Sequence, residues 1–248
     1  MNASEAVGSA MPFAEPASMR QFVSGLLARR RCFILVALAP LLLPVCGHAA
    51  PAWPDTALSR VEMLALLQTL NADLLSHPSA TLTLERWCAD HRLAPEPKIV
   101  ARRVRGAEKA LPEADRSRLA IGPDEPVRYR RVQLACGDKV LSDADNWYVP
   151  ARLTPEMNRA LDETDTPFGR VVQALHFRRE TLAARLLWSP LPENWAVADA
   201  GIPAAAPVPP ARVLEHRAIL YTGDNLPFSE VVETYTGDVL AFPAPPLR

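Results

Sequence analysis

The sequence predicts an α+β fold in which helices pack on an antiparallel β-sheet. Three observations predict it: strand-like segments joined by tight turns, helical segments between them, and a globular composition with 49% hydrophobic and 22% charged residues. Strands joined by short turns pair antiparallel, and the apolar face of their sheet needs helices to cover it. We therefore expect one domain over residues 50–248.

Residues 1–49 predict an export signal peptide. Arg29, Arg30 and Arg31 precede an apolar run over residues 33–45, and small residues follow up to Ala50. This is the order of a secretory signal. The run would reach only ~20 Å as a helix, short of the ~30 Å hydrocarbon core. We expect cleavage after Ala49 and a periplasmic or secreted protein with no stable membrane span; a retained anchor is the alternative.

The start of this leader is open, because Met19 would give a shorter basic segment than Met1.

Helices are expected in four places. Apolar residues recur at helical spacing over residues 59–75, and a second short helix is expected over 83–88. Thr154-Pro155-Glu156 combines an N-cap residue, a proline at the first helical position and an acid in the first turn. Thr166-Pro167 begins another helix that is expected to run to Leu175.

Strands are expected in two hairpins and two short segments. The first hairpin pairs residues 127–136 with 140–149 across Gly137-Asp138-Lys139, and the second pairs 213–221 with 226–235. Short strands are expected at 98–104 and 239–242. Residues 176–187 fit a strand or a helix, and a Pro/Ala-rich loop is expected near 189–212.

Several classes of function are excluded by what the sequence lacks. The net charge is −1 and no basic stripe is present, which argues against a nucleic-acid partner. No Cys-x-x-Cys or His-x-x-x-His spacing supports a metal site, and no Gly-rich phosphate loop follows a strand. Cys88 and Cys136 follow the leader; they could pair in an oxidising compartment or remain buried thiols, and the sequence leaves both open.

Three ordered segments of the second half resemble one known family. They are Tyr129–Cys136, Thr166-Pro167-Phe168-Gly169-Arg170 and Asn225-Leu226-Pro227-Phe228-Ser229-Glu230. Together they resemble chorismate lyase, which splits chorismate into 4-hydroxybenzoate and pyruvate. The resemblance implies a chorismate-lyase-like fold, a small aromatic or dicarboxylic acid as partner, and no cofactor.

The resemblance also implies site residues. Arg131 matches an arginine that binds the ligand carboxylate, and Glu230 matches the catalytic acid. Phe168 matches an apolar residue of the ring pocket, while Arg179 and Ala80, in a Ser79–Thr81 loop, are further binding candidates. A planar guanidinium can grip a carboxylate, and a partly buried glutamate can move protons. The alternative is that Arg131 and Glu230 simply lie on an exposed sheet face.

One departure from the family separates the functional hypotheses. Where the family often has Gly-Arg, this chain has Asp145-Asn146, so a positive charge that could hold a dicarboxylate is missing. Arg179 could compensate. The first hypothesis is a lyase acting on chorismate or a related enol-ether acid. The alternative is a non-catalytic extracytoplasmic domain that binds a small aromatic or carboxylic acid, and a purely structural envelope protein is a third. The oligomeric state is open.

Overall fold

The computed structural model describes residues 53–197 and 201–246. The chain divides into two units, Met1–Cys46 and Gly47–Arg248, and the described residues belong to the second. The predicted leader lies outside the described residues. Within the described ranges, no helix combines the length and the apolar character needed to cross a membrane.

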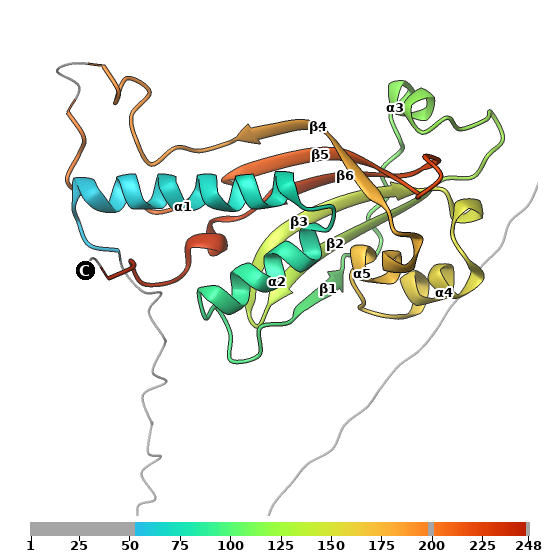
Figure 1. Cartoon of the computed structure of the whole chain (residues 1–248), viewed down its shortest axis with the longest axis horizontal. Coiled ribbons are helices and arrows are strands. Elements are labelled where there is room, and N and C mark those ends of the chain that lie inside the picture. Colours follow the sequence, from blue (N-terminus) through green and yellow to red (C-terminus); the bar gives the residue numbers. More distant parts are fainter. Residues whose placement is uncertain (1–52, 198–200, 247–248) are drawn as a thin grey trace, which may run out of the picture. The chain divides into compact units, whose positions relative to one another are not determined.

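Six antiparallel strands form one sheet in the order β1-β2-β3-β6-β5-β4 (Figure 1). The predicted α+β fold with an antiparallel sheet is therefore confirmed. Residues 176–187, which fitted either type of structure, contribute the edge strand β4. The strands are β1 (Ile99–Arg103), β2 (Arg128–Cys136), β3 (Lys139–Tyr148), β4 (Arg178–Leu186), β5 (Leu214–Tyr221) and β6 (Pro227–Tyr235).

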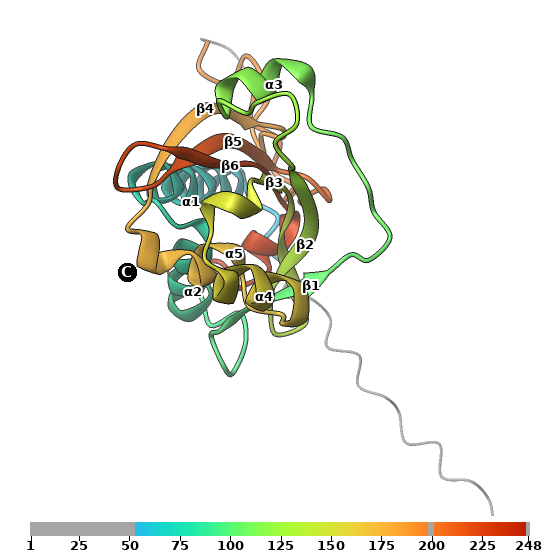
Figure 2. The same ribbon diagram turned by 90° about the vertical axis from the view of Figure 1, so that its right-hand side faces the viewer.

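Helices cover mainly one face of this sheet, which we call the inner face. The covering helices are α1 (Ala57–Ser76), α2 (Ala80–Asp90), α4 (Pro155–Glu163) and α5 (Phe168–Val171). In Figure 2 the sheet curves around these helices, while α3 (Glu113–Arg118) lies on the opposite, outer face. The sequence did not predict α3. The described part of the 189–212 segment contains no helix or strand, as expected of a loop.

Alternation along the strands decides which side chains reach the interior. On β2, Arg130, Val132 and Leu134 are buried, whereas Arg131 is exposed and Gln133 is half-buried. Successive strand residues point to opposite faces, so the three buried side chains share the inner face. On β6, the inner-face positions include Val231 and Glu233.

Capping side chains begin the helices. The Thr154 hydroxyl accepts a hydrogen bond from the Met157 backbone N–H, which confirms the predicted start of α4. The Ser79 hydroxyl accepts one from Leu82 in the same way. As a result α2 begins at Ala80, and the expected Ser79–Thr81 loop is the first turn of a helix.

The expected strand over 239–242 is wrong. A 3-10 helix spans Gly237–Leu240, and the Thr236 hydroxyl accepts a hydrogen bond from Asp238 N–H at its start. The indole N–H groups of Trp87 and Trp53 donate to the carbonyls of Val239 (2.8 Å) and Leu240 (3.2 Å). These tertiary bonds hold the segment in a helical turn despite its strand-like composition. A second 3-10 helix, Gln173–Leu175, continues the helix that was expected to run from Thr166 and ends at the left-handed His176 (φ 46°). A third spans Pro150–Arg152.

A disulfide joins Cys88 on α2 to Cys136 at the end of β2. Their Cα atoms are 6.3 Å apart, within the range that a disulfide spans. The bond closes a loop over a sequence separation of 48 residues. In the chain-entropy description, a loop of that length stabilises the fold by about 4 kcal/mol.

We predict that the double variant Cys88→Ala, Cys136→Ala lowers the free energy of unfolding by about 2–5 kcal/mol, because the unfolded chain regains the freedom that the disulfide removes. Urea denaturation measures the effect, and the wild-type protein with reductant is the control that should behave alike. An unchanged midpoint in both would contradict the disulfide.

Candidate functional site

A group of polar side chains lies on the otherwise apolar inner face of the sheet. They line a cavity, which we call the inner pocket, between the strands, the first turn of α2 and α5. Four of its lining side chains, Arg130, Asn146, Arg179 and Glu233, can donate or accept strong hydrogen bonds, and Phe168 and Phe177 form aromatic walls. Buried polar groups are normally paired, so their partners indicate what the pocket can hold.

Arg130 is buried without a counter-ion. The residue is 8% exposed, and its Nη2 donates to the Thr166 carbonyl at 3.3 Å. Its Nε has no partner, and no described carboxylate forms an ion pair with it. Burial, with a contribution from nearby Arg103, lowers the pKa of Arg130 to about 10. Asp165 and Asp162 act in the other direction without forming an ion pair with Arg130, so at neutral pH the side chain carries a positive charge that has no direct ionic partner among the described residues.

Asn146 lies directly opposite Arg130 on the neighbouring strand. The Ser229 hydroxyl donates a hydrogen bond to Asn146 Oδ1 at 2.6 Å. This bond fixes the orientation of the amide, so that Nδ2 lies on the side away from Ser229. This Nδ2 is buried and has no partner among the described residues. Two neighbouring strands thus present two buried, unused donors, Arg130 Nε and Asn146 Nδ2, side by side.

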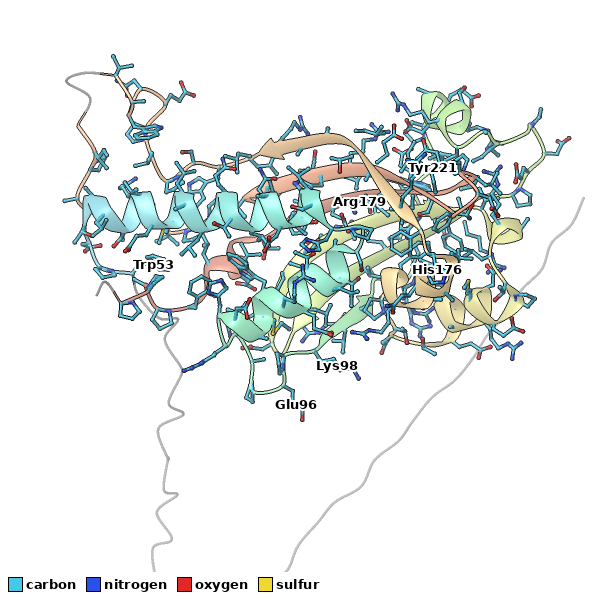
Figure 3. The ribbon with its side chains drawn as sticks, in the orientation of Figure 1. Trp53, Glu96, Lys98, His176, Arg179 and Tyr221 are labelled. Carbon is cyan, nitrogen blue, oxygen red and sulfur yellow. A yellow bond between two sulfur atoms is a disulfide. The ribbon has the colours of Figure 1, made fainter. Side chains whose placement is uncertain are left out.

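Arg179 and Glu233 form an ion pair in the same pocket. Arg179 Nη2 lies 2.6 Å from Glu233 Oε2, and the two side chains are 5% and 8% exposed. The Tyr235 hydroxyl donates to the same oxygen at 3.2 Å. Burial alone would lower the pKa of Arg179, but the attraction of Glu233 outweighs it and raises that pKa. In Figure 3, Arg179 is labelled beside the end of α1, next to the strand β4 to which it belongs.

His216 supports this pair from the next strand. It lies opposite Glu233 on β5, and its Nε2–H group donates to Asn71 Oδ1 on α1 at 2.8 Å. Burial lowers the pKa of His216 to about 4, although Glu233 acts in the other direction. At neutral pH the ring is therefore uncharged and adds no positive charge beside the pocket.

The first turn of α2 forms the rim of the inner pocket, with Ala80 in the lining. Gly169 of α5 packs closely against this turn, since a Cβ atom on Gly169 would lie 2.9 Å from the Ser79 hydroxyl. The sequence Thr-Pro-Phe-Gly thus places Phe168 in the pocket while the following glycine lets α5 approach α2.

The inner pocket is small and borders a larger depression. It encloses about 40 Å³. A neighbouring depression of about 280 Å³, which we call the outer basin, also involves His77 and Arg178. The two share Pro78, Phe177 and Arg179. The Phe177 ring, packed edge-on against Phe228 at 6.3 Å, therefore stands between them.

The structure separates the residues expected to form the site. Phe168, Arg179 and Ala80 line the inner pocket, and their contact with a ligand stays a prediction. The expectation that Arg131 and Glu230 flank this pocket is wrong, because both lie on the outer face. Arg131 is exposed and borders a separate polar depression with Asp145.

Glu230 is fully buried on the outer face in a network of its own. Its Oε1 lies 2.5 Å from Arg217 Nη2, and Arg217 also pairs with Asp115 of α3. Desolvation raises the pKa of Glu230, although Arg217 opposes the shift. Through Arg217, Glu230 links α3 to the sheet. It does not line the inner pocket.

Sequence reasoning missed Arg130, Asn146 and Glu233. A signal for the first was present: Val132 and Leu134 have the same strand parity as Arg130, and an apolar row marks the buried face. In the same way, Val231 has the strand parity of Glu233 and indicates that Glu233 lies on the buried face. Asn146 was noted only as a departure from the chorismate-lyase pattern.

Comparison with known proteins finds one relative of high identity. The chain is 59% identical over 196 residues to "Uncharacterized protein y4mC" of Sinorhizobium fredii (strain NBRC 101917 / NGR234), covering 78% of this chain and 83% of that protein. No protein-family model matches the chain.

Solved structures of lower similarity include three bacterial proteins, two of them described as regulators. PhnF from Mycobacterium smegmatis has a TM-score of 0.44 at 12% identity, covering 69% of this chain and 70% of that one. The ligand-binding domain of a putative GntR-family regulator from Bordetella bronchiseptica has a TM-score of 0.36 at 17% identity, covering 56% and 82%. The possible regulator YydK from Bacillus subtilis has 0.34 at 14%, and the match spans 56% of this chain and only 57% of YydK. At these TM-scores the likeness transfers no ligand or activity.

The lowered pKa of His216 predicts a pH-dependent stability. Between pH 6.5 and about 4, His216 is protonated in the unfolded chain but not in the folded protein. The stabilisation that depends on neutral His216 is therefore fully present above pH 6.5 and is lost as the pH falls towards 4. The loss by pH 4 is about 3 kcal/mol. Urea denaturation of the wild type and His216→Gln across this range measures it, and the variant should lose this component. Identical pH dependence of the two proteins would contradict the prediction.

Proposed function

The chain belongs to the same family as y4mC of Sinorhizobium fredii, and we propose that it is a binding domain for a small carboxylic acid, held in the inner pocket by Arg130 and Asn146. The observation that carries the proposal is the buried guanidinium of Arg130, whose Nε has no hydrogen-bond partner among the described residues, next to the unused amide nitrogen of Asn146. A buried charge without a partner is strongly unfavourable. A ligand carboxylate would accept one hydrogen bond from Arg130 Nε and one from Asn146 Nδ2.

The dimensions of the pocket support a carboxylate head group attached to an apolar body. A volume of about 40 Å³ leaves room for the head group and not for a ring. Pockets for whole small molecules measure about 300–1,000 Å³. The body of the ligand would extend past Phe177 into the outer basin, where Leu75, Pro78 and Phe177 offer apolar contacts. Binding therefore requires the Phe177 ring to turn aside.

The lyase hypothesis finds less support in this arrangement. Elimination of pyruvate needs an acid that faces the ligand, and Glu230 lies on the other face of the sheet. Glu233 is on the inner face, but its carboxylate is engaged by Arg179 and Tyr235. Chorismate also carries two carboxylates, whereas Arg130 alone lacks a counter-ion among the pocket residues. We therefore favour binding without turnover, on a fold that resembles chorismate lyase.

We place the domain outside the cytoplasm as part of the proposal. The composition of residues 1–49 and the Cys88–Cys136 disulfide both support an oxidising compartment.

Arg130→Met should abolish ligand binding. Isothermal titration of the purified protein with benzoate and 4-hydroxybenzoate should give a Kd that rises at least about 100-fold in this variant, because a carboxylate would enter the pocket unpaired. Arg131→Met, which removes the adjacent arginine from the outer face, is the matched control and should change the Kd less than about threefold.

Equal losses in the two variants would contradict the assignment of Arg130, and absence of binding to the wild type would refute the proposed function. Incubation with chorismate tests the alternative, since pyruvate release would favour the lyase.

The same Arg130→Met variant should be more stable than the wild type without ligand. Replacing even a buried ion pair by apolar side chains is often neutral or stabilising by about 1–4 kcal/mol, and a buried cation without an ion pair has less attraction to lose. Thermal unfolding measures this, with Arg131→Met again as the control. A strongly destabilised Arg130→Met protein would indicate that the arginine serves the fold.

A further inference from the structure

We propose that Glu233 acts as an internal carboxylate that occupies Arg179, so that the inner pocket accepts ligands with one carboxylate and rejects those with two. The inference rests on the proposed function and names the class of ligand. It follows from the charges that line the pocket and from the way in which Glu233 is held.

The charged side chains of the pocket add up to a single positive charge. Among the described lining residues, Arg130 and Arg179 are cationic and Glu233 is anionic. His216, beside the pair, is neutral at pH 7 because its pKa is about 4. A single carboxylate therefore neutralises the inner pocket, whereas a second carboxylate brought against Arg179 would add a negative charge beside Glu233. A buried charge without a partner is strongly unfavourable in a medium of low dielectric constant.

Glu233 stands where a second ligand carboxylate would need to bind. Arg179 lines both the inner pocket and the outer basin, so a second carboxylate near the boundary between them would lie beside it. Its guanidinium already binds Glu233 at 2.6 Å, and Tyr235 donates to the same carboxylate. Both members of the pair are more than nine-tenths buried. An incoming carboxylate would have to displace Glu233 or lie beside a like charge.

Asn146 contributes to the same selectivity. It lines the pocket directly opposite Arg130 on the neighbouring strand. A cationic side chain at this position would add a second positive charge and suit a dicarboxylate. Because this chain has an amide, the donor that lies beside Arg130 offers a hydrogen bond without a charge. Discrimination of this kind works by penalising the wrong ligand as well as by holding the right one.

The experiment compares benzoate with isophthalate and terephthalate by isothermal titration at pH 7. The two dicarboxylates present the second carboxylate at different angles to Arg179. The wild type should bind benzoate at least about tenfold more tightly than either. Glu233→Gln keeps the size and hydrogen bonding of the side chain but frees the charge of Arg179. In that variant one of the dicarboxylates should bind more tightly than benzoate.

Glu230→Gln is the matched control, because it removes an equally buried, arginine-paired glutamate from the outer face. Its preference for benzoate should equal that of the wild type. Asn146→Arg provides a second variant if Glu233→Gln does not fold, and it should also gain affinity for a dicarboxylate.

The outcomes separate this inference from the proposed function. A wild type that binds neither class of acid refutes both. A wild type that binds benzoate through Arg130, but binds a dicarboxylate equally well, overturns only the selectivity. The same holds if neither Glu233→Gln nor Asn146→Arg changes the ratio of affinities, or if Glu230→Gln changes it as much.

Discussion

Arg130 imposes the constraint on which the rest of the site depends, because a buried cation needs a counter-ion or a ligand. The other charged groups of the interior are already balanced: Arg179 is paired with Glu233, and burial keeps His216 neutral. Ser229 holds the Asn146 amide so that its nitrogen points away from the hydroxyl. None of these contacts supplies an ion-pair partner to Arg130. Arg130 Nε and Asn146 Nδ2 therefore remain without partners among the described residues, side by side on the inner face, where the proposed function places an anion.

The two faces of the sheet have different roles: the inner face carries the proposed binding site, and the outer face carries the ion pairs that attach α3. On the inner face, the helices and the two phenylalanines enclose the polar group and exclude water. On the outer face, Glu230 and Arg217 attach α3, so a glutamate that resembles a catalytic residue in sequence holds the fold together. Because successive residues of a strand alternate between faces, a shift of one position exchanges these roles. Arg130 and Arg131 are neighbours in the chain, yet one is buried at the pocket and the other is exposed.

Local signals in the sequence predicted most of the fold. Gly137 (φ +58°) and Asn225 (φ 63°) stand in the turns of the two hairpins, and Thr154 caps α4 as expected. The sequence could not predict features that depend on tertiary contacts, such as the helical turn held by two indoles or the pairing of Cys88 with Cys136. For the site, Phe168, Arg179 and Ala80 were named from the resemblance and do line the pocket. The resemblance pointed to Arg131, whereas the apolar row of Val132 and Leu134 indicates that Arg130 is the arginine on the buried face.

The central claim is that Arg130 anchors a carboxylate on the inner face of the sheet. Its most direct test is a crystal structure with 4-bromobenzoate, in which the anomalous scattering of bromine fixes the orientation of the ligand. The account predicts the carboxylate against Arg130 Nε and Asn146 Nδ2, with the Phe177 ring turned aside and the bromine in the outer basin. A bromobenzoate bound at Arg131 on the outer face, or one whose carboxylate displaces Glu233 from Arg179 while Arg130 stays without a counter-ion, would contradict it.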